Sequence, residues 1–360
     1  MTSVDRQQAF SGTKDAAPAL RIDVGQLERY LATHINGFAG PLSVRQFKGG
    51  QSNPTYLLET PGRRYVLRRK PPGKLLPSAH AVDREYRVMA ALAGTDVPVP
   101  KTYALCDDAE VIGTAFFLMD YVEGRVLWDP TLPELTPAQR TAHYREMNRV
   151  IAALHRVDPA AVGLADYGKP GNYLARQIDR WSRQYRASET ERIEAMDRLI
   201  EWLPANVPPG EETSIVHGDY RIDNVVFHPT EPRVLAVLDW ELSTLGHPLA
   251  DFAYHCMTWR MPEGAHARGL VGVDFAALGI PTEHEYVAMY CKATGRDRIE
   301  HFEYYVAYNM FRLAAILQGV MARALQGNAA SAEALAAGRR TRAIAEEGWR
   351  QVERMLATRN

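Results

Sequence analysis

The feature that most constrains the fold of this chain is a change of hydrophobic pattern near Glu123-Gly124. Before that point, apolar and polar residues alternate in short runs that end at Gly and Pro, which is typical of antiparallel strands. Beyond it, most apolar residues recur with helical spacing. This change predicts an α+β chain with two lobes joined by a short connector. We expect a flexible tail over residues 1–18, a small β-rich lobe over 19–122 and a large, mainly helical lobe over 123–360.

The β-rich lobe is predicted to begin with a short helix over residues 24–31, which Asp23 is placed to cap. Three strand-like runs separated by Gly and Pro turns then predict an antiparallel meander, over 42–47, 55–58 and 65–68. We expect a helix that opens at Ser78, followed by two further strands at 102–106 and 114–121. These elements would form one sheet with helices packed against it.

The helical lobe contains one exception to its helical pattern. Five helices are predicted, over residues 137–156, 174–188, 191–203, 283–294 and 299–325. Residues 214–240 instead alternate like a strand, a loop and a second strand. The most polar part of this segment, from His217 to Asn224, is therefore expected to be a loop held at both ends.

Charge and composition exclude several classes of function. The 360 residues include 42 Lys+Arg and 43 Asp+Glu, whereas nucleic-acid-binding domains are usually strongly basic. No apolar run reaches the roughly 18 residues that a membrane span needs, and the first residues lack the apolar core of an export signal. The 3 Cys residues are far apart and form no paired motif. We expect a cytoplasmic globular protein that binds neither nucleic acid nor membranes.

The predicted loop from His217 to Asn224 carries groups suited to phosphoryl transfer. This reaction needs a carboxylate that accepts the proton of the attacking hydroxyl, and oxygen ligands for a divalent metal. Asp219 would supply the first group. The metal ligands would be the amide oxygen of Asn224 and the carboxylate of Asp239, which ends an apolar strand-like run.

These residues carry a resemblance to a known family. His217-Gly218-Asp219 with Asn224 is similar to the kinase catalytic loop H-[RG]-D-x-x-x-x-N, and Asp239 stands where kinases have a metal-binding aspartate. Gly218 and the run Asp239-Trp240-Glu241 resemble the aminoglycoside phosphotransferase/choline kinase-like family. More narrowly, several stretches resemble the kinase-like domains related to those fused to acyl-CoA dehydrogenases in some eukaryotes, namely 49–53, 65–76, 80–86 and 239–249. The resemblance implies a bilobal protein-kinase-like fold that uses ATP and Mg²⁺.

The resemblance also implies where the nucleotide would bind. The loop that would cover its phosphates consists of Gly49, Gly50, Gln51, Ser52 and Asn53. Gly-Gly between strands is also an ordinary turn, so this part of the pattern has two interpretations. The main-chain groups of Asp120 and Val122 would contact adenine.

A cation for the phosphates is implied at the third strand of the meander. Strand alternation puts Val66 and Arg68 on one face, at the positions of the alanine and lysine in the kinase motif V-A-I-K. Arg68 can bind phosphate with two donors, and Lys70 is the alternative. Glu85 would be the ionic partner of Arg68.

Two further residues are expected to support the catalytic loop. His217 would have a structural role, and Asp251 would brace the loop.

The leading hypothesis is an ATP- and Mg²⁺-dependent kinase that phosphorylates a hydroxyl of a small molecule, with a hydroxyacyl-CoA or related acyl metabolite as the candidate acceptor. One alternative is an aminoglycoside-type antibiotic phosphotransferase. A second is a nucleotide-binding pseudokinase module, for which the only sign is arginine in place of lysine at position 68. A metal-dependent hydrolase is disfavoured, since no cluster of His residues with ligand spacing accompanies His217.

Overall fold

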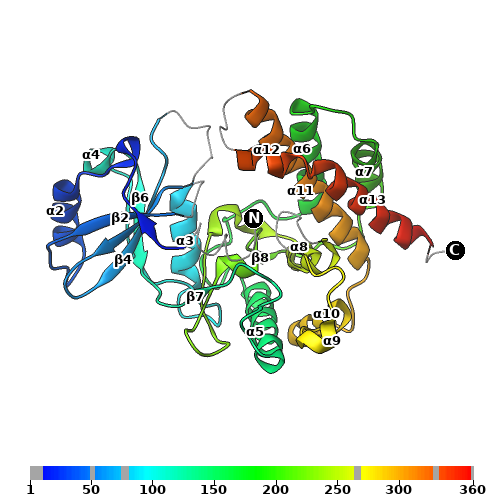
Figure 1. Cartoon of the computed structure of the whole chain (residues 1–360), viewed down its shortest axis with the longest axis horizontal. Coiled ribbons are helices and arrows are strands. Elements are labelled where there is room, and N and C mark those ends of the chain that lie inside the picture. The colour runs from blue at the N-terminus through cyan, green and yellow to red at the C-terminus, as the bar shows by residue number, and fades with distance from the viewer. Residues whose placement is uncertain (1–10, 49–52, 74–80, 263–268, 327–331, 358–360) are drawn as a thin grey trace. The chain divides into compact units, whose positions relative to one another are not determined.

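The structure is a computed structural model that describes residues 11–48, 53–73, 81–262, 269–326 and 332–357. The chain divides into two compact units (Figure 1). The sheet unit consists of Met1–Asp129, Val162–Leu164 and Arg221–Ser243. The helical unit consists of Pro130–Ala161, Ala165–Tyr220 and Thr244–Asn360.

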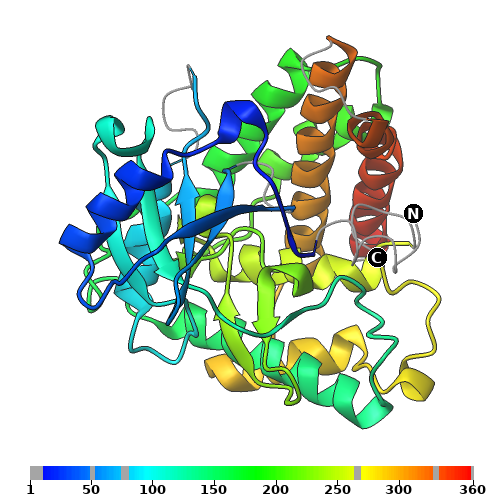
Figure 2. The same cartoon turned by 60° about the vertical axis from the view of Figure 1, so that its left-hand side comes forward.

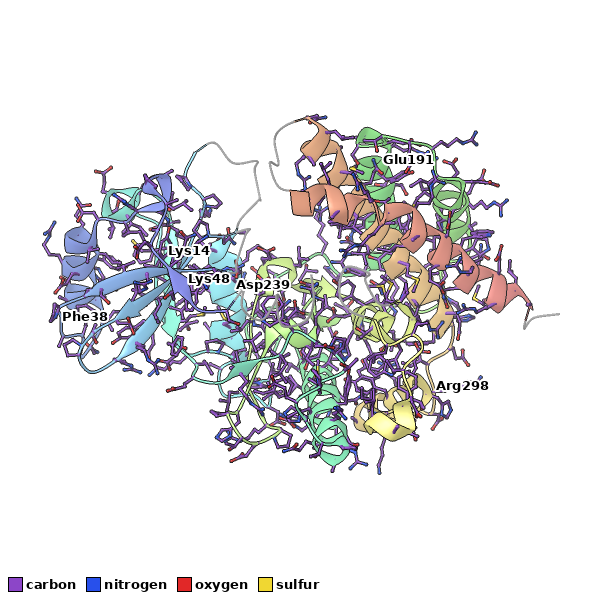
Figure 3. The ribbon with its side chains drawn as sticks, in the orientation of Figure 1. Lys14, Phe38, Lys48, Glu191, Asp239 and Arg298 are labelled. Carbon is purple, nitrogen blue, oxygen red and sulfur yellow. The ribbon has the colours of Figure 1, made fainter. Side chains whose placement is uncertain are left out.

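The sheet unit is built on a six-stranded sheet in which every neighbouring pair is antiparallel. In spatial order its strands are β1 (Thr13–Lys14), β2 (Ser43–Phe47), β3 (Thr55–Glu59), β4 (Arg64–Arg69), β6 (Phe116–Asp120) and β5 (Thr102–Cys106). The predicted meander is confirmed as β2, β3 and β4. Strand β1, on which Figure 3 labels Lys14, pairs with β2 inside the segment for which we predicted a flexible tail. The first ten residues of that tail lie outside the described residues.

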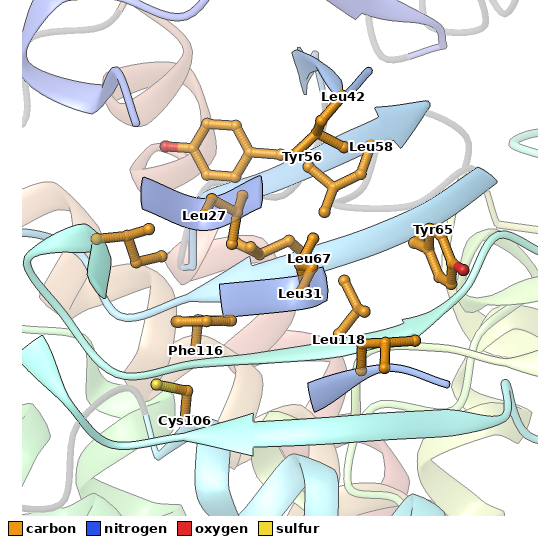
Figure 4. Packing of buried hydrophobic residues seen from close by; sticks show 12 residues of the cluster. Leu27, Leu31, Leu42, Tyr56, Leu58, Tyr65, Leu67, Cys106, Phe116 and Leu118 are labelled. Atoms are coloured by element: carbon orange, nitrogen blue, oxygen red, sulfur yellow. The ribbon is translucent and has the colours of Figure 1, made fainter. Parts of the chain in front are cut away.

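Helices pack on both faces of this sheet. Helix α2 (Val24–His34) starts at the predicted cap, where the Asp23 carboxylate accepts a hydrogen bond from the backbone N–H of Gln26. Its buried residues Leu27 and Leu31 belong to the same apolar cluster as side chains from β3, β4 and β6 (Figure 4). Helix α3 (Val82–Leu92) packs against β5 and β6. The predicted opening of this helix at Ser78 lies outside the described residues.

The pairing register places Arg68 on the α3 face of the sheet. Side chains alternate between the two faces along a strand, and directly paired residues share a face. Arg68 pairs with Phe117, and Val66 pairs with Met119. The ring of Phe117 lies 6.3 Å from the ring of Tyr86 on α3, centroid to centroid. The predicted common face of Val66 and Arg68 is therefore confirmed.

A smaller sheet joins the sheet unit from later in the chain. Strands β10 (Val234–Val237), β9 (Val225–Phe227) and β7 (Arg125–Val126) pair in that order. The backbone N–H of Val237 donates to the carbonyl of Pro98 at 2.9 Å, which ties this hairpin to the first part of the chain. Sequence patterns assigned residues 221–243 to the helical lobe, whereas these backbone bonds group them with the sheet.

The helical unit contains most of the remaining elements. Its helices are α5 (Pro137–Arg156), α6 (Tyr173–Ala187), α7 (Glu194–Ala205), α8 (Pro248–Arg260), α9 (Phe275–Leu278), α10 (Glu283–Thr294), α11 (Phe302–Leu325), α12 (Ala332–Gly338) and α13 (Thr341–Ala357). Strands β8 (Ser214–Val216) and β11 (Thr244–Gly246) form a two-stranded sheet. Short elements in the sheet unit are η1 (Pro18–Leu20), α4 (Ala109–Ile112), η2 (Ile222–Asn224) and η3 (Trp240–Leu242). Helices α11 and α13 lie side by side (Figure 2).

Several helix predictions agree closely with the structure, whereas α13 was not predicted although one of its faces is apolar and buried. The predicted bounds of α5 and α10 are confirmed to the residue, and both helices begin with a capping box. Helix α8 was not predicted, because nearly all of its residues are buried and no apolar stripe marks it. No helix among the described residues combines the length and the apolarity needed to cross a bilayer.

We predict that Leu118→Ala lowers the free energy of unfolding of the sheet unit by about 2–5 kcal/mol, as expected for a fully buried leucine. Leu118 is 0% exposed on β6, within the apolar cluster. The matched control is Leu105→Ala on the neighbouring strand β5, where the side chain is 38% exposed. Urea unfolding followed by circular dichroism compares the two variants, and equal losses would contradict this description of the core.

Candidate active site

An antiparallel hairpin of the sheet unit brings Asn224 and Asp239 to the same end. Asn224 ends η2 directly before β9, and Asp239 lies two residues after the end of β10. Val225 pairs with Val237, and the backbone N–H of Leu238 donates to the carbonyl of Asn224 at 2.8 Å. These two predicted metal ligands, distant in sequence, are thus neighbours in the backbone ladder.

Asp239, labelled in Figure 3, has an unusual backbone conformation. Its φ of 66° and ψ of 57° lie in the left-handed region, which non-glycine residues seldom adopt. A residue in this conformation lowers the stability of the fold by of order 1–3 kcal/mol, so the conformation persists only where the surrounding structure requires it. The strain coincides with a carboxylate that makes a short ion pair.

That ion pair centres on Arg68, whose buried guanidinium contacts three carboxylates of the sheet unit. Its Nε lies 2.9 Å from Oε2 of Glu85 on α3. Its Nη2 lies 2.6 Å from Oδ1 of Asp239 and 3.2 Å from Oε2 of Glu241. One cation therefore connects strand β4, helix α3 and the turn that follows β10.

The charges in this cluster shift the ionisation of its members. Burial raises the pKa of Glu85 to about 7, and the charges of Asp239 and Glu241 add to the rise against the lowering effect of Arg68. Burial alone would lower the pKa of Arg68, but the three carboxylates raise it above its usual value. The cluster has more negative than positive groups, so it favours a cation.

Asn53 takes a position that sequence reasoning did not predict. It was expected in the loop that covers the phosphates. The other residues of that loop, Gly49, Gly50, Gln51 and Ser52, lie outside the described residues. The amide nitrogen of Asn53 donates to Oε1 of Glu85 at 2.9 Å, and Asn53 is fully buried. Asn53 thus helps to hold the carboxylate that pairs with Arg68.

The two candidate phosphate cations differ in their surroundings. Arg68 lies within the carboxylate cluster, with its side chain 10% exposed. The Nζ of Lys70 lies 4.0 Å from Oδ1 of Asp83, and the Lys70 side chain is 34% exposed. Of the two, Arg68 is the residue that contacts both Glu85 and Asp239.

The predicted adenine-contacting segment follows strand β6. The backbone N–H of Asp120 donates to the carbonyl of Lys101 at 2.8 Å, so Asp120 could offer adenine only its carbonyl. The Asp120 side chain accepts a hydrogen bond from the hydroxyl of Tyr103 at 2.5 Å. Val122 lies just beyond the strand, after Tyr121, whose ring stacks on that of Phe47 at 6.5 Å between centroids.

In the helical unit, Asp251 holds the start of the predicted catalytic loop. Its carboxylate on α8 accepts hydrogen bonds from the backbone N–H groups of His217 and Gly218, both at 2.8 Å. His155 Nε2 lies 3.1 Å from the same carboxylate. Burial alone would raise the pKa of Asp251, but these contacts hold it below its usual value. The brace predicted for Asp251 is present, and Gly218 adopts a left-handed φ of 83° that favours glycine.

Asp219 follows this braced turn and has contacts of its own. Its backbone N–H donates to Nδ1 of His217 at 3.2 Å, so the His217 ring has the structural role expected of it. The hydroxyl of Tyr254 on α8 donates to Oδ1 of Asp219. Arg312 on α11 donates to the carbonyl of Gly218 at 2.9 Å. Sequence reasoning missed Tyr254 and Arg312, since neither belongs to a local motif.

The predicted site residues are therefore distributed over both units. Asp219 belongs to the helical unit, whereas the predicted nucleotide and metal residues within the described ranges belong to the sheet unit. Across the part of the chain that the structure describes, no three or more His, Cys, Asp or Glu side chains are arranged to hold a metal ion. Any divalent cation would need ligands from other groups as well.

Comparison with known sequences gives consistent results. Residues 43–289 match the family described as "Phosphotransferase enzyme family". The chain is 48% identical over 342 residues to acyl-CoA dehydrogenase family member 10 of Mus musculus, covering 94% of this chain and 32% of that protein. It is 45% identical over 345 residues to family member 11 of Gallus gallus, covering 94% and 44%. The chain thus spans less than half the length of these curated relatives.

Solved structures show the same fold. A crystal structure from Ralstonia eutropha, of a protein provisionally assigned as an aminoglycoside phosphotransferase, is 59% identical with a TM-score of 0.86 and covers 93% of this chain and 99% of that one. The aminoglycoside phosphotransferase APH(4)-Ia in complex with AMP-PNP and hygromycin B is 18% identical with a TM-score of 0.55, over 90% and 98% of the two chains. This second likeness shows the fold alone, and the predicted α+β kinase-like fold is confirmed. Because the family match covers well over half of the chain, the chain belongs to the phosphotransferase enzyme family.

Proposed function

We propose that this chain is an ATP- and Mg²⁺-dependent kinase that phosphorylates a hydroxyl group of a small molecule. The family to which it belongs supports ATP-dependent phosphoryl transfer to small molecules. The observation that carries the proposal is the buried contact of Arg68 with both Glu85 and Asp239. It places arginine where the kinase motif has lysine, beside a carboxylate at the end of the β9–β10 hairpin. The lobes proposed from the sequence span 19–122 and 123–360, apart from residues 221–243, which group with the sheet unit, and the proposed location is the cytoplasm.

In this proposal Arg68 binds the phosphates of ATP. Its guanidinium has several donors in one plane, which suits two contacts with phosphate oxygens. Glu85 holds the guanidinium at Nε, and the amide of Asn53 in turn holds Glu85. This support leaves little freedom to Arg68, so less entropy is lost when phosphate binds. Residues 49–52 would cover the phosphates, and the carbonyl of Asp120 and the main chain of Val122 would contact adenine.

The residues on the hairpin suit Mg²⁺. Asn224 offers an amide oxygen and Asp239 a carboxylate, and hard oxygen ligands are those that Mg²⁺ prefers. Mg²⁺ is usually bound in proteins by one or two carboxylates together with substrate phosphates and water. When bound, Mg²⁺ would neutralise negative charge on the transferred phosphoryl group.

Asp219 is proposed as the general base. Its carboxylate would accept the proton of the acceptor hydroxyl as that oxygen forms a bond to the γ-phosphorus. The bond between the γ-phosphorus and the bridging oxygen breaks in the same transfer, and ADP leaves. Asp251 and Arg312 support this role because they hold the backbone on the N-terminal side of Asp219.

The surroundings of Asp219 bear on the acceptor. The Arg312 guanidinium lies over the rings of Tyr254, at 5.3 Å, and Trp181, at 5.9 Å. Arg180 lies over the same Trp181 ring at 5.3 Å. Cations and aromatic rings near the base disfavour a polycationic aminoglycoside and suit an anionic acceptor. We therefore propose a hydroxyacyl-CoA or related acyl metabolite, in line with the acyl-CoA dehydrogenase names of the curated relatives.

The pseudokinase alternative has less support. Its only sign in the sequence was arginine at position 68. That arginine contacts Glu85 and Asp239 at 2.9 and 2.6 Å, and Asp219, Asn224 and Asp239 are all present. A nucleotide-binding module without catalysis would not need this complete set.

We predict that Asp219→Asn lowers kcat by about 10²- to 10⁴-fold, the usual contribution of a positioned base, and leaves MgATP affinity within about twofold. ADP release and isothermal titration calorimetry measure the two quantities. Asp197→Asn, at a surface carboxylate of α7 paired with Arg192, is the matched control and should retain wild-type turnover. Wild-type turnover by Asp219→Asn would refute the assignment of the base.

We predict that Arg68→Ala weakens MgATP binding by about 10- to 100-fold, as expected when a charge-assisted hydrogen bond is lost. Lys70 is near Arg68 in the chain but lies outside its carboxylate cluster. Lys70→Ala should therefore change the affinity for MgATP by less than about twofold. Calorimetry with MgATP compares the variants, with melting temperatures measured in parallel to confirm folding. A larger loss in Lys70→Ala would make Lys70 the phosphate-binding cation.

The acceptor class is tested with three compounds and MgATP. We expect phosphorylation of 3-hydroxybutyryl-CoA, none of butyryl-CoA, which lacks the hydroxyl, and a kcat/KM for hygromycin B at least about 100-fold lower. Mass spectrometry detects the phosphorylated product directly. Preference for hygromycin B would favour the antibiotic phosphotransferase, and nucleotide binding without any turnover would favour the pseudokinase.

A further inference from the structure

The Asp219 carboxylate has a hydrogen-bond donor that the catalytic loop does not provide. The hydroxyl of Tyr254, on helix α8 of the same unit, donates to Oδ1 of Asp219. We propose that Tyr254 is a positioning residue, which fixes the rotation of the Asp219 carboxylate and stabilises its charged form. This inference rests on the proposed role of Asp219 as the base.

One helix controls both the backbone and the side chain of the loop. Asp251 and Tyr254 are separated by three residues on α8, so they lie on the same face about one turn apart. Asp251 accepts hydrogen bonds from the N–H groups of His217 and Gly218, both at 2.8 Å. Tyr254 then contacts the carboxylate of the next residue, Asp219. The position of the proposed base relative to α8 is therefore determined at two successive points.

Arg312 supports the Tyr254 ring from α11. Its guanidinium carbon lies 5.3 Å from the centroid of the Tyr254 ring, and its Nη2 donates to the carbonyl of Gly218 at 2.9 Å. Arg312 is only 7% exposed, so this charge is poorly screened by water. A positive charge beside the ring holds it in place and makes the phenol a stronger hydrogen-bond donor.

These contacts have two chemical consequences for Asp219. A bond at Oδ1 limits rotation about the Cβ–Cγ bond, and so determines the direction of Oδ2. A hydrogen bond to a carboxylate also favours its charged form, the form that can accept a proton. Without the Tyr254 hydroxyl, the carboxylate would lose this restraint on its rotation and this stabilisation of its charge.

The test compares Tyr254→Phe, which removes only the hydroxyl, with Tyr304→Phe. Tyr304 is a buried tyrosine of the same unit whose hydroxyl donates to the carbonyl of Leu203 at 2.8 Å. The probe is MgATP with water as acceptor, with ADP release followed between about pH 5 and 9. For Tyr254→Phe we expect kcat to fall by about 10- to 100-fold, KM for MgATP to stay within about twofold, and the acidic limb of the kcat profile to move to higher pH. Tyr304→Phe should change none of these.

A double-mutant cycle tests whether Tyr254 acts through Asp219. In Asp219→Asn the carboxylate is absent, so adding Tyr254→Phe should lower kcat no further. A further fall in the double variant would overturn the proposal. It is equally overturned if Tyr254→Phe lowers only the melting temperature, with kcat per folded molecule and the acidic limb unchanged.

The outcomes separate this inference from the proposed function. Full activity of Asp219→Asn, or no ADP release by the wild-type chain with either water or 3-hydroxybutyryl-CoA as acceptor, would contradict the proposed function and the inference with it. An inactive Asp219→Asn together with a fully active Tyr254→Phe would refute only the inference. If Tyr254→Phe does not fold, Arg312→Lys serves in its place, because it replaces the planar guanidinium that contacts Gly218 while lying over the Tyr254 ring. That variant should move the acidic limb in the same direction, and an unmoved limb would overturn the proposal.

Discussion

The sheet unit depends on one buried cation. The guanidinium of Arg68 joins β4 to Glu85 of α3 and to Asp239 and Glu241 in the turn after β10. Removing a charge from water costs several kcal/mol, which is recovered only when partners and geometry are both good. Here the cation satisfies three carboxylates that would otherwise repel one another. The same ion pairs connect elements far apart in sequence, so the contacts that stabilise the unit also assemble the proposed phosphate and metal groups.

The helical unit controls its own reactive group by different means. The catalytic loop is held by neutral backbone groups, with Asp251 accepting from two N–H groups and Arg312 donating to one carbonyl. The Asp219 carboxylate is then oriented by a side chain, through the hydroxyl of Tyr254. The proposed base would need to be oriented and kept charged, and a braced backbone together with the Tyr254 donor serves both needs. In the sheet unit, by contrast, charge balance is the main constraint.

Much of the fold could be predicted because its elements have simple periods. The meander β2–β3–β4 and the helices α5 and α10 follow the expected alternation or helical spacing, and their ends coincide with turn residues or caps. Helix α8 has no such signal, because it is buried on nearly all sides. The candidate catalytic loop was predicted from the spacing of a few residues, which remains recognisable whatever the surrounding packing. Asn53 was expected at the phosphates and instead contacts Glu85, since its burial depends on α3.

The sequence by itself determined the family, the β2–β3–β4 meander and several helices, and it gave the candidate site residues, because these depend on local period and on residue spacing. It favoured Arg68 as the phosphate cation and left Lys70 as the alternative. Only tertiary structure showed that Arg68 contacts Glu85 and Asp239, since this contact requires a strand, a helix and a later hairpin to meet. Tyr254 and Arg312 likewise reach the loop of Asp219 from helices α8 and α11. Contacts of this kind join residues that no local pattern relates, so packing alone decides them.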